Sequence, residues 1–279
     1  MDTGPVHPVE SNMALRFDNV SFSYDRVKVF ENTSFHIHQG EFVALTGPNG
    51  TGKTTALKLL LGLENPEAGK IEIFGKSDKR QRERIGYVPQ QAHLDGSFPI
   101  TVNQVVRMGC LNPASRFFGG NDRIAVEEAM EKAEIADLAL RPYNALSGGQ
   151  RRRVLLARAL ASLFKWDRKT GQETKEPGLL VLDEPTANLD AESEYLLFMT
   201  LEKLKGNTTI LIVTHDRDFV SSLVDRVLCM GGSHDASQPG GKYAVVQHRL
   251  RDSKILHDES FPADACYPND SRCPEHKHD

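Results

Sequence analysis

The chain has 279 residues, 39% of them hydrophobic and 26% charged, so it can bury a sizeable core and lacks a disordered composition. Its 34 Lys and Arg residues face 38 Asp and Glu, and the formal charge of −4 argues against a protein that coats nucleic acid. No apolar run approaches the roughly 18 residues of a membrane-spanning helix, and residues 1–13 lack the features of a secretory signal. The four cysteines are too sparse for a disulfide framework. We therefore expect a soluble cytosolic protein with no nucleic-acid partner.

The first predicted elements are strands that lead into a glycine-rich turn. Alternating apolar residues predict two strands, at residues 14–25 and 29–40, with a turn between them. Residues 41–63 predict a buried strand, a Gly-rich turn and a helix in succession, and residues 70–76 predict a further strand.

The middle of the chain changes to helical periodicity. Apolar residues recur at helical spacing in three segments, residues 101–109, 124–138 and 148–163. Two short apolar runs follow, at 178–185 and 208–216, and both are typical of parallel strands that are covered on both faces.

The last predicted elements are a helix at residues 217–230 and one more strand at 242–248. Taken together, the pattern predicts a three-layer α/β domain over residues 14–250, interrupted by an all-helical insertion at about 91–160.

The remaining segments are expected to lie outside this domain. Residues 1–13 predict a flexible arm, and the polar, Pro-containing residues 251–279 predict a disordered tail. Residues 162–178 predict a surface excursion in which we see no chemistry. The cysteines and histidines of the tail allow a zinc-binding hypothesis, but they lack paired ligand spacing, which favours a solvated chain.

A phosphate-binding loop is predicted between the strand and the helix of residues 41–63. The sequence fits GxxxxGK(S/T), and its glycines let consecutive main-chain N–H groups form an anion nest at a helix N-terminus. Lys53 would neutralise the β- and γ-phosphates, and the Thr54 hydroxyl would ligate Mg²⁺. The residues expected to bind nucleotide here are Gly47, Pro48, Asn49, Gly50, Thr51, Gly52, Lys53, Thr54 and Thr55.

Two carboxylates follow the aliphatic run at residues 179–182. The strand would deliver Asp183 to the sheet edge of the phosphate loop, because α/β sheets bind ligands at the carboxyl ends of their strands. We expect Asp183 to hold Mg²⁺ through its water shell and Glu184 to polarise the attacking water as general base. His215 ends the next apolar run and is expected to contact the γ-phosphate, although a lone histidine there is more often structural.

A second anion site is predicted at Leu146-Ser147-Gly148-Gly149-Gln150, where a serine and two glycines begin a helix. The full set of motifs is, in chain order, the phosphate loop, Gln90, Ser147–Gln150, Asp183-Glu184 and His215. This set resembles the nucleotide-binding subunit of an ABC transporter, over residues 14 to about 230. The resemblance implies an α/β fold, with a P-loop three-layer ABC ATPase core, an antiparallel β subdomain and an inserted α-helical subdomain.

The resemblance also implies an ATPase that uses ATP and Mg²⁺ and acts as a head-to-tail homodimer. In that dimer Ser147, Gly148, Gly149 and Gln150 of one subunit would close over ATP held by the other subunit's phosphate loop. Asp190 matches the loop that crosses the dimer seam. The basic run Arg151 to Arg153 is expected to flank the site or face solvent.

Two further positions carry over from the resemblance. Tyr24 matches the aromatic residue that stacks on adenine, with a core aromatic on a strand face as the alternative. Gln90 matches the glutamine that links Mg²⁺ and the attacking water to the helical insertion. Gln91 is a competing choice, but the spacing after Val88-Pro89 favours Gln90.

Residues 98–109 resemble the corresponding segment of zinc and manganese importers, whereas the simpler interpretation is that Thr101 caps a helix. The resemblance implies an ATPase subunit that powers import of a divalent transition metal from the cytoplasmic face of the inner membrane. Its partners would be integral-membrane permease subunits and, indirectly, a solute-binding protein. An importer ATPase for another cargo and a soluble non-transport ABC ATPase stay open as alternatives.

Overall fold

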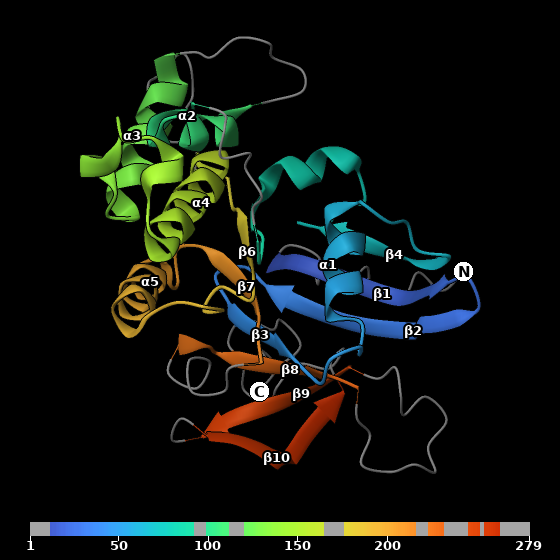
Figure 1. Ribbon diagram of the computed structural model, residues 1–279. Coiled ribbons are helices and arrows are strands. Elements are labelled where there is room, and N and C mark those ends of the chain that lie inside the picture. The colour runs from blue at the N-terminus through green and yellow to red at the C-terminus, as the bar shows by residue number, and fades with distance from the viewer. Residues whose placement is uncertain are drawn as a thin grey trace, which may run out of the picture. The chain divides into compact units, whose positions relative to one another are not determined.

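The computed structural model describes residues 12–91, 99–111, 120–164, 176–215, 223–231, 245–251 and 254–262 (Figure 1). The chain divides into two compact units. The first comprises Met1–Arg82 and Asp225–Asp279, and the second comprises Glu83–Val224.

The first unit contains a three-stranded antiparallel sheet in the order β2-β1-β4. Its strands are β1 (Met13–Tyr24), β2 (Val27–His38) and β4 (Ala68–Ile73), and Figure 1 shows them side by side. The alternating pattern places Phe17 opposite Phe35, and their rings stack with centroids 4.3 Å apart. Both rings are buried, so one face of this sheet belongs to the core of the unit.

A second group of strands in this unit has the order β10-β9-β8-β3. Strand β3 (Phe42–Thr46) pairs in parallel with β8 (Arg226–Met230), and β8 pairs antiparallel with β9 (Val245–Arg251), which pairs with β10 (Lys254–Pro262). Because Phe42 to Leu45 are all buried, β3 is a fully covered strand, and helix α1 (Lys53–Leu61) follows it after a short loop.

Two predictions for this unit are wrong. Residues 226–230 form strand β8, whereas the sequence predicts that a helix continues to residue 230; a five-residue apolar run has no period that separates the two. Residues 254–262 form strand β10 within the segment predicted as a disordered tail, because pairing with β9 satisfies their main chain. The strand predicted at 242–248 is confirmed as β9, and Met13 begins β1 rather than ending an arm.

Several predictions fall outside the described residues. They concern residues 1–11 of the arm, the central part of the 162–178 excursion, and the tail beyond Pro262 with its cysteines.

The second unit contains three parallel strands in the order β7-β6-β5. They are β5 (Ile85–Val88), β6 (Leu179–Asp183) and β7 (Thr209–Val213). Every residue of β7 and the first four of β6 are buried, as the continuous apolar runs predict. Helix α5 (Ala191–Leu204) follows β6; neither α5 nor β5 is among the predicted elements.

Three helices of the second unit pack together (Figure 1). They are α2 (Val102–Arg107), α3 (Gly120–Lys132) and α4 (Gly148–Leu163), and α4 also packs on β5. Short 3₁₀ turns complete the described helical structure: η2 (Lys79–Arg84), η3 (Met108–Cys110), η4 (Ala136–Leu138) and η5 (Tyr143–Ala145). Among the described residues no helix has the length and apolar character needed to cross a membrane.

Candidate functional site

The loop between β3 and α1 takes its shape from glycine. Gly47 has φ 148°, and a Cβ atom at this position would collide with the main-chain oxygen of Met230. Gly50 has φ 81°, in the left-handed region that favours glycine, and open space around its Cα. Pro48, Asn49 and Gly50 are exposed, so the outer surface of the loop is accessible to a ligand.

The N-terminus of α1 fits an anion. Its N-cap is Gly52, no side chain caps the first turn, and the first turn carries no acidic residue. The unbonded N–H groups and the positive end of the helix dipole therefore point to a phosphate rather than to the protein's own carboxylates. The loop therefore offers the main-chain N–H donors that the phosphates of a nucleoside triphosphate need.

Lys53, which is expected to neutralise the phosphates, is buried in the phosphate loop. Its Nζ donates to the oxygen of Gly47 at 2.6 Å and to that of Pro48 at 2.9 Å. An ammonium group held by main-chain carbonyls keeps its charge at the centre of the loop. Thr54, in contrast, is exposed, and its hydroxyl has the hard oxygen that Mg²⁺ prefers.

Tyr24 lies at the end of β1 with 37% of its surface exposed. Its ring packs edge-to-face on Phe22, with centroids 4.9 Å apart, and Lys58 Nζ lies 3.3 Å from its hydroxyl. The structure therefore does not bury Tyr24 as a core aromatic, and leaves part of its ring available for stacking.

In the second unit, Glu184 has a main chain that non-glycine residues rarely adopt. Its φ is 43°, and its N–H donates to the oxygen of Val213 at 2.8 Å. Residues in such conformations persist where the surroundings determine them, and they cluster at functional sites. The strained position follows the end of β6 directly, where the sequence predicts a general base.

The Glu184 side chain is 13% exposed and faces a histidine. His215 Nδ1 lies 2.9 Å from Oε2 of Glu184, and the histidine itself is 73% exposed. Oε2 is buried and, among the described residues, accepts no hydrogen bond of good geometry. The histidine thus lies against the carboxylate that the sequence predicts as general base.

Asp183 receives a hydrogen bond from β5. The Tyr87 hydroxyl donates to Oδ2 of Asp183 at 3.4 Å, and burial, followed by the charge of Asp183, raises the pKa of Tyr87 to about 12. The phenol therefore stays protonated and remains a donor at neutral pH. Tyr87 is absent from the predicted site, and its contact with Asp183 depends on the pairing of β5 with β6, which could not be known before β5 was identified.

Arg152 flanks the predicted hydrolytic residues, one of the two expectations for the basic run, and does not face solvent. It is only 6% exposed, and its guanidinium donates to main-chain oxygens of Pro89, Gln90, Glu184 and Pro185. Burial lowers its pKa from the ordinary arginine value, with the negative charge of Asp183 opposing that shift. The neighbouring Arg151 is exposed, as predicted, and donates to the Asn144 oxygen.

Gln90 and Gln91 are both exposed, after the end of β5. Gln90 is fixed through its main-chain oxygen, which accepts from Arg152 Nη1 at 3.0 Å. The structure thus ties the predicted glutamine, by its backbone, to the same guanidinium that holds Glu184.

The start of α4 forms a capping box. Ser147 Oγ accepts from Gln150 N at 3.2 Å, and the Gln150 side chain accepts from Ser147 N at 3.1 Å. Ser147 and Gly148 are exposed, and a Cβ atom at Gly148 would meet nothing within 4 Å. Main-chain N–H groups of this first turn can therefore be approached from outside.

The second glycine of this motif explains how α4 and α5 come close. A Cβ atom at Gly149 would collide with Ser193 Oγ, so only glycine permits the contact. Ser193 in turn donates from its N–H to Asp190 Oδ1 at 2.9 Å and from its hydroxyl to Oδ2 at 3.1 Å. These two bonds lower the pKa of Asp190, which caps α5 beside the start of α4.

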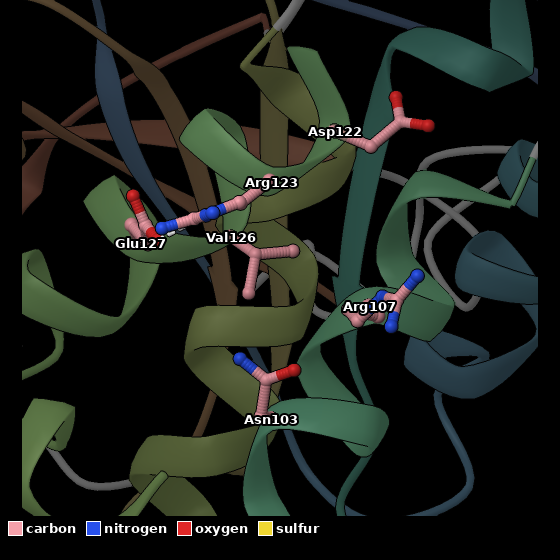
Figure 2. Close-up of a pocket in the computed structure, with 6 residues that line it drawn as sticks. All are labelled: Asn103, Arg107, Asp122, Arg123, Val126 and Glu127. Atoms are coloured by element: carbon pink, nitrogen blue, oxygen red, sulfur yellow. Dashed lines mark hydrogen bonds and ion pairs between the residues drawn. The ribbon is translucent and has the colours of Figure 1, made fainter. Parts of the chain in front are cut away.

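The helices α2 and α3 enclose a separate cavity of about 320 Å³ (Figure 2). It is lined by Asn103, Arg107, Asp122, Arg123, Val126 and Glu127. None of these belongs to the predicted nucleotide-binding set, and Arg123 is paired with Glu127 at 2.8 Å. Thr101 caps α2 in a capping box with Gln104, which confirms its predicted role as N-cap.

The fold and these residues define a class of protein. A glycine-rich loop with a lysine precedes a helix that no side chain caps, and elsewhere in the α/β fold an Asp-Glu pair ends a strand beside a histidine. This combination is characteristic of P-loop NTPases. The family model described as "ABC transporter" matches residues 30–187.

Curated relatives extend the match over most of the chain. The zinc uptake system ATP-binding protein ZurA of Listeria innocua is 34% identical over 269 residues, covering 93% of this chain and 98% of the relative. The manganese transport system ATP-binding protein MntB of Halalkalibacterium halodurans is 35% identical over 222 residues, covering 78% and 83%. The chain belongs to the ABC transporter ATP-binding family and is an ATPase.

Solved structures agree on the fold. The cbiO1 protein of Clostridium perfringens, part of the ABC transporter complex cbiONQ, superposes with a TM-score of 0.65 at 29% identity, covering 78% of this chain and 85% of that one. A bacterial ABC transporter cassette solved as a dimer gives a TM-score of 0.64 at 26% identity, covering 85% and 99%. The predicted ABC ATPase fold is thereby confirmed.

Proposed function

We propose that this chain is the ATP-hydrolysing subunit of an importer for a divalent transition metal, zinc or manganese. The observation that carries the hydrolytic part is Glu184, whose left-handed main chain directly after β6 places its carboxylate against His215. The names of the relatives that match most of the chain, zinc and manganese transport ATP-binding proteins, support the cargo.

ATP is bound through the first unit. The main-chain N–H groups of Gly47–Thr55 and the start of α1 hold the phosphates, and Lys53 supplies the compensating charge. The half-exposed ring of Tyr24 stacks on the adenine. Thr54 of the first unit, and Gln90 and Asp183 of the second, are the residues that would hold Mg²⁺, which would neutralise charge on the phosphate oxygens.

Hydrolysis depends on the second unit. Glu184 accepts the proton of the attacking water through its carboxylate. His215, whose ring lies 2.9 Å from that carboxylate, orients Glu184 and donates to the γ-phosphate. Gln90 contacts the attacking water and links it to the helical insertion.

The working form is a head-to-tail homodimer. The exposed start of α4, with Ser147, Gly148, Gly149 and Gln150, closes on ATP held by Gly47–Thr55 of the partner subunit, because its first-turn N–H groups form a second anion site. The dimeric state of a solved relative supports this arrangement. Asp190, next to the same motif, contacts the partner across the seam.

The membrane partner is a permease, and the helical insertion is the surface that receives its cytoplasmic helix. Met108, Leu111 and Ile124 are exposed apolar side chains on this insertion. Charged residues line the neighbouring α2–α3 cavity, so an amphipathic helix would find both apolar and ionic partners there. The subunit would then work on the cytoplasmic face of the inner membrane, with a solute-binding protein delivering metal from the other side.

Uptake of radiolabelled metal tests this function. Cells that lack the gene should regain uptake of zinc or manganese when they express the wild-type chain, and not when they express Glu184→Gln at the same level. A copurified integral-membrane permease is expected with both forms. Normal uptake of both metals in the cells without the gene would exclude metal import, and absence of any membrane partner would favour a soluble ABC ATPase.

A further inference from the structure

Arg152 is the most completely engaged buried cation in the described part of the second unit. Its Nε donates to the Pro185 oxygen at 3.0 Å, and Nη2 donates to the Glu184 oxygen at 2.7 Å. Its Nη1 donates to the Pro89 oxygen at 2.6 Å and to the Gln90 oxygen at 3.0 Å. One planar guanidinium thus joins two loops that are far apart in the sequence.

These two loops carry the residues assigned to hydrolysis. Pro89 and Gln90 follow β5, whereas Glu184 and Pro185 follow β6. Parallel pairing of β5 with β6 ends at Val88 and Leu182, whereas β6 stays paired with β7 as far as Asp183. The sheet ladder therefore does not join the loop after β5 to the loop after β6. The guanidinium extends the cross-link between β5 and β6 past the end of their pairing, because each of its three nitrogens donates to a main-chain oxygen of one of the two loops.

Glu184 needs such a restraint. Its left-handed φ of 43° is unfavourable for a glutamate, and hydrogen bonds of its main chain hold it. Its N–H donates to the Val213 oxygen, and its oxygen accepts from Ala187 N at 3.2 Å and from Arg152 Nη2 at 2.7 Å. If the shorter bond from Arg152 is lost, the main chain of Glu184 is less restrained, and its carboxylate can turn away from the direction fixed by the strand end.

We propose that Arg152 is a positioning residue for hydrolysis, which holds the main chain of Glu184 and of Gln90 in one fixed arrangement. The inference rests on the proposed role of Glu184 as general base. It also ties that arrangement to α4, whose first turn, at Ser147, is the part proposed to close on the partner's ATP.

Two substitutions at Arg152 test the role. Arg152→Gln keeps at most two donors and Arg152→Lys keeps a charge with three, so kcat should fall about tenfold or more in the first and less in the second. The KM for ATP and the dissociation constant of a fluorescent ATP analogue should stay within about twofold, because the phosphate loop is untouched. Arg153→Gln is the matched control: it removes a bond of the same kind, to the Glu134 oxygen, and should keep the wild-type kcat.

Thermal unfolding of each variant separates positioning from loss of structure. A kcat for Arg152→Gln equal to that of Arg153→Gln overturns the proposal. So does a loss of kcat matched by an equal loss of ATP affinity, since a general disruption of the fold lowers both. If Arg152→Gln does not fold, the kcat and KM of Arg152→Lys decide in the same way.

Single-turnover hydrolysis in the Glu184→Gln background provides the last readout. If Arg152 acts through Glu184, adding Arg152→Gln to Glu184→Gln should lower the residual rate by much less than it lowers the wild-type rate. Equal factors in both backgrounds overturn the positioning role. A wild-type rate in Glu184→Gln alone would instead mean that the proposed base is wrong, which keeps the two failures distinct.

Discussion

Each unit of the molecule contains a buried arginine, and the two are used differently. In the first unit, Arg226 pairs with Glu41 through Nε and Oε1 at 2.8 Å and through Nη2 and Oε2 at 2.9 Å. Both side chains are almost completely buried, and Nη2 also donates to the His36 oxygen. In the second unit, Arg152 donates to four main-chain oxygens around the residues assigned to hydrolysis.

The two arginines have different roles: Arg226 stabilises the fold, whereas Arg152 fixes the conformation of loops at the site. A buried ion pair fixes β8 to the segment before β3, and its geometry depends on two side chains that compensate each other's charge. A guanidinium on main-chain oxygens fixes loop conformation, which is the property that a catalytic carboxylate needs. We therefore expect Arg226 to govern stability and Arg152 to govern turnover.

The largest stability effect is expected from Arg226→Met. Removing one member of the pair leaves Glu41 buried and uncompensated, which costs about 3–5 kcal/mol. Urea unfolding followed by circular dichroism measures the change. The matched control is Lys203→Met, which breaks the exposed pair with Glu134 and should cost less than about 1 kcal/mol. Equal small changes in both variants would show that burial of the pair does not matter.

A smaller loss of stability, with a large loss of binding, is expected from Gly47→Ala. The new Cβ atom would collide with the Met230 oxygen at φ 148°, so the loop must move, at a cost of about 1–3 kcal/mol. We expect the affinity for ATP to fall about tenfold or more as the N–H groups lose their arrangement. Gly50→Ala, which meets no atom within 4 Å, isolates the effect of φ and should cost less. The reverse order of the two variants would contradict the steric account.

The smallest effect concerns Tyr87 and alkaline pH. Because burial raises its pKa to about 12 in the folded chain, above the value of about 10 expected when unfolded, the folded state holds the phenol proton more tightly. The stability that this provides is complete below about pH 10 and is lost as pH rises toward 12. The difference in unfolding free energy between the wild type and Tyr87→Phe should therefore shrink over that window. A constant difference would place the phenol in an ordinary aqueous setting.

The sequence predicts the local motifs of the site better than it predicts strand β8. Glycine, lysine and threonine at fixed spacing are local requirements, so the loop of Gly47–Thr55 and the strand end at Asp183-Glu184 can be predicted from neighbouring residues alone. Strand β8 could not, because Arg226–Met230 is a short apolar run without a distinguishing period, and its partner β3 is distant in the chain.

The burial and the acceptors of Arg152 could not be predicted, for a related reason. Three consecutive arginines at a helix start are usually solvated, and their role depends on which of them faces the core. Helical spacing provides a signal, since Arg152 is in phase with the buried Leu156 and Leu160. That signal indicates burial but names no acceptor, because the oxygens of Pro89 and Glu184 come from two loops that only the tertiary fold brings together.

Different residues carry the binding of ATP and its hydrolysis, and Glu184→Gln separates the two. ATP affinity and steady-state turnover with Mg²⁺ should be measured on this variant beside Lys53→Ala. We predict that Glu184→Gln binds ATP with near wild-type affinity and loses about 100-fold or more of its turnover, whereas Lys53→Ala loses affinity. Wild-type turnover in Glu184→Gln would contradict the account.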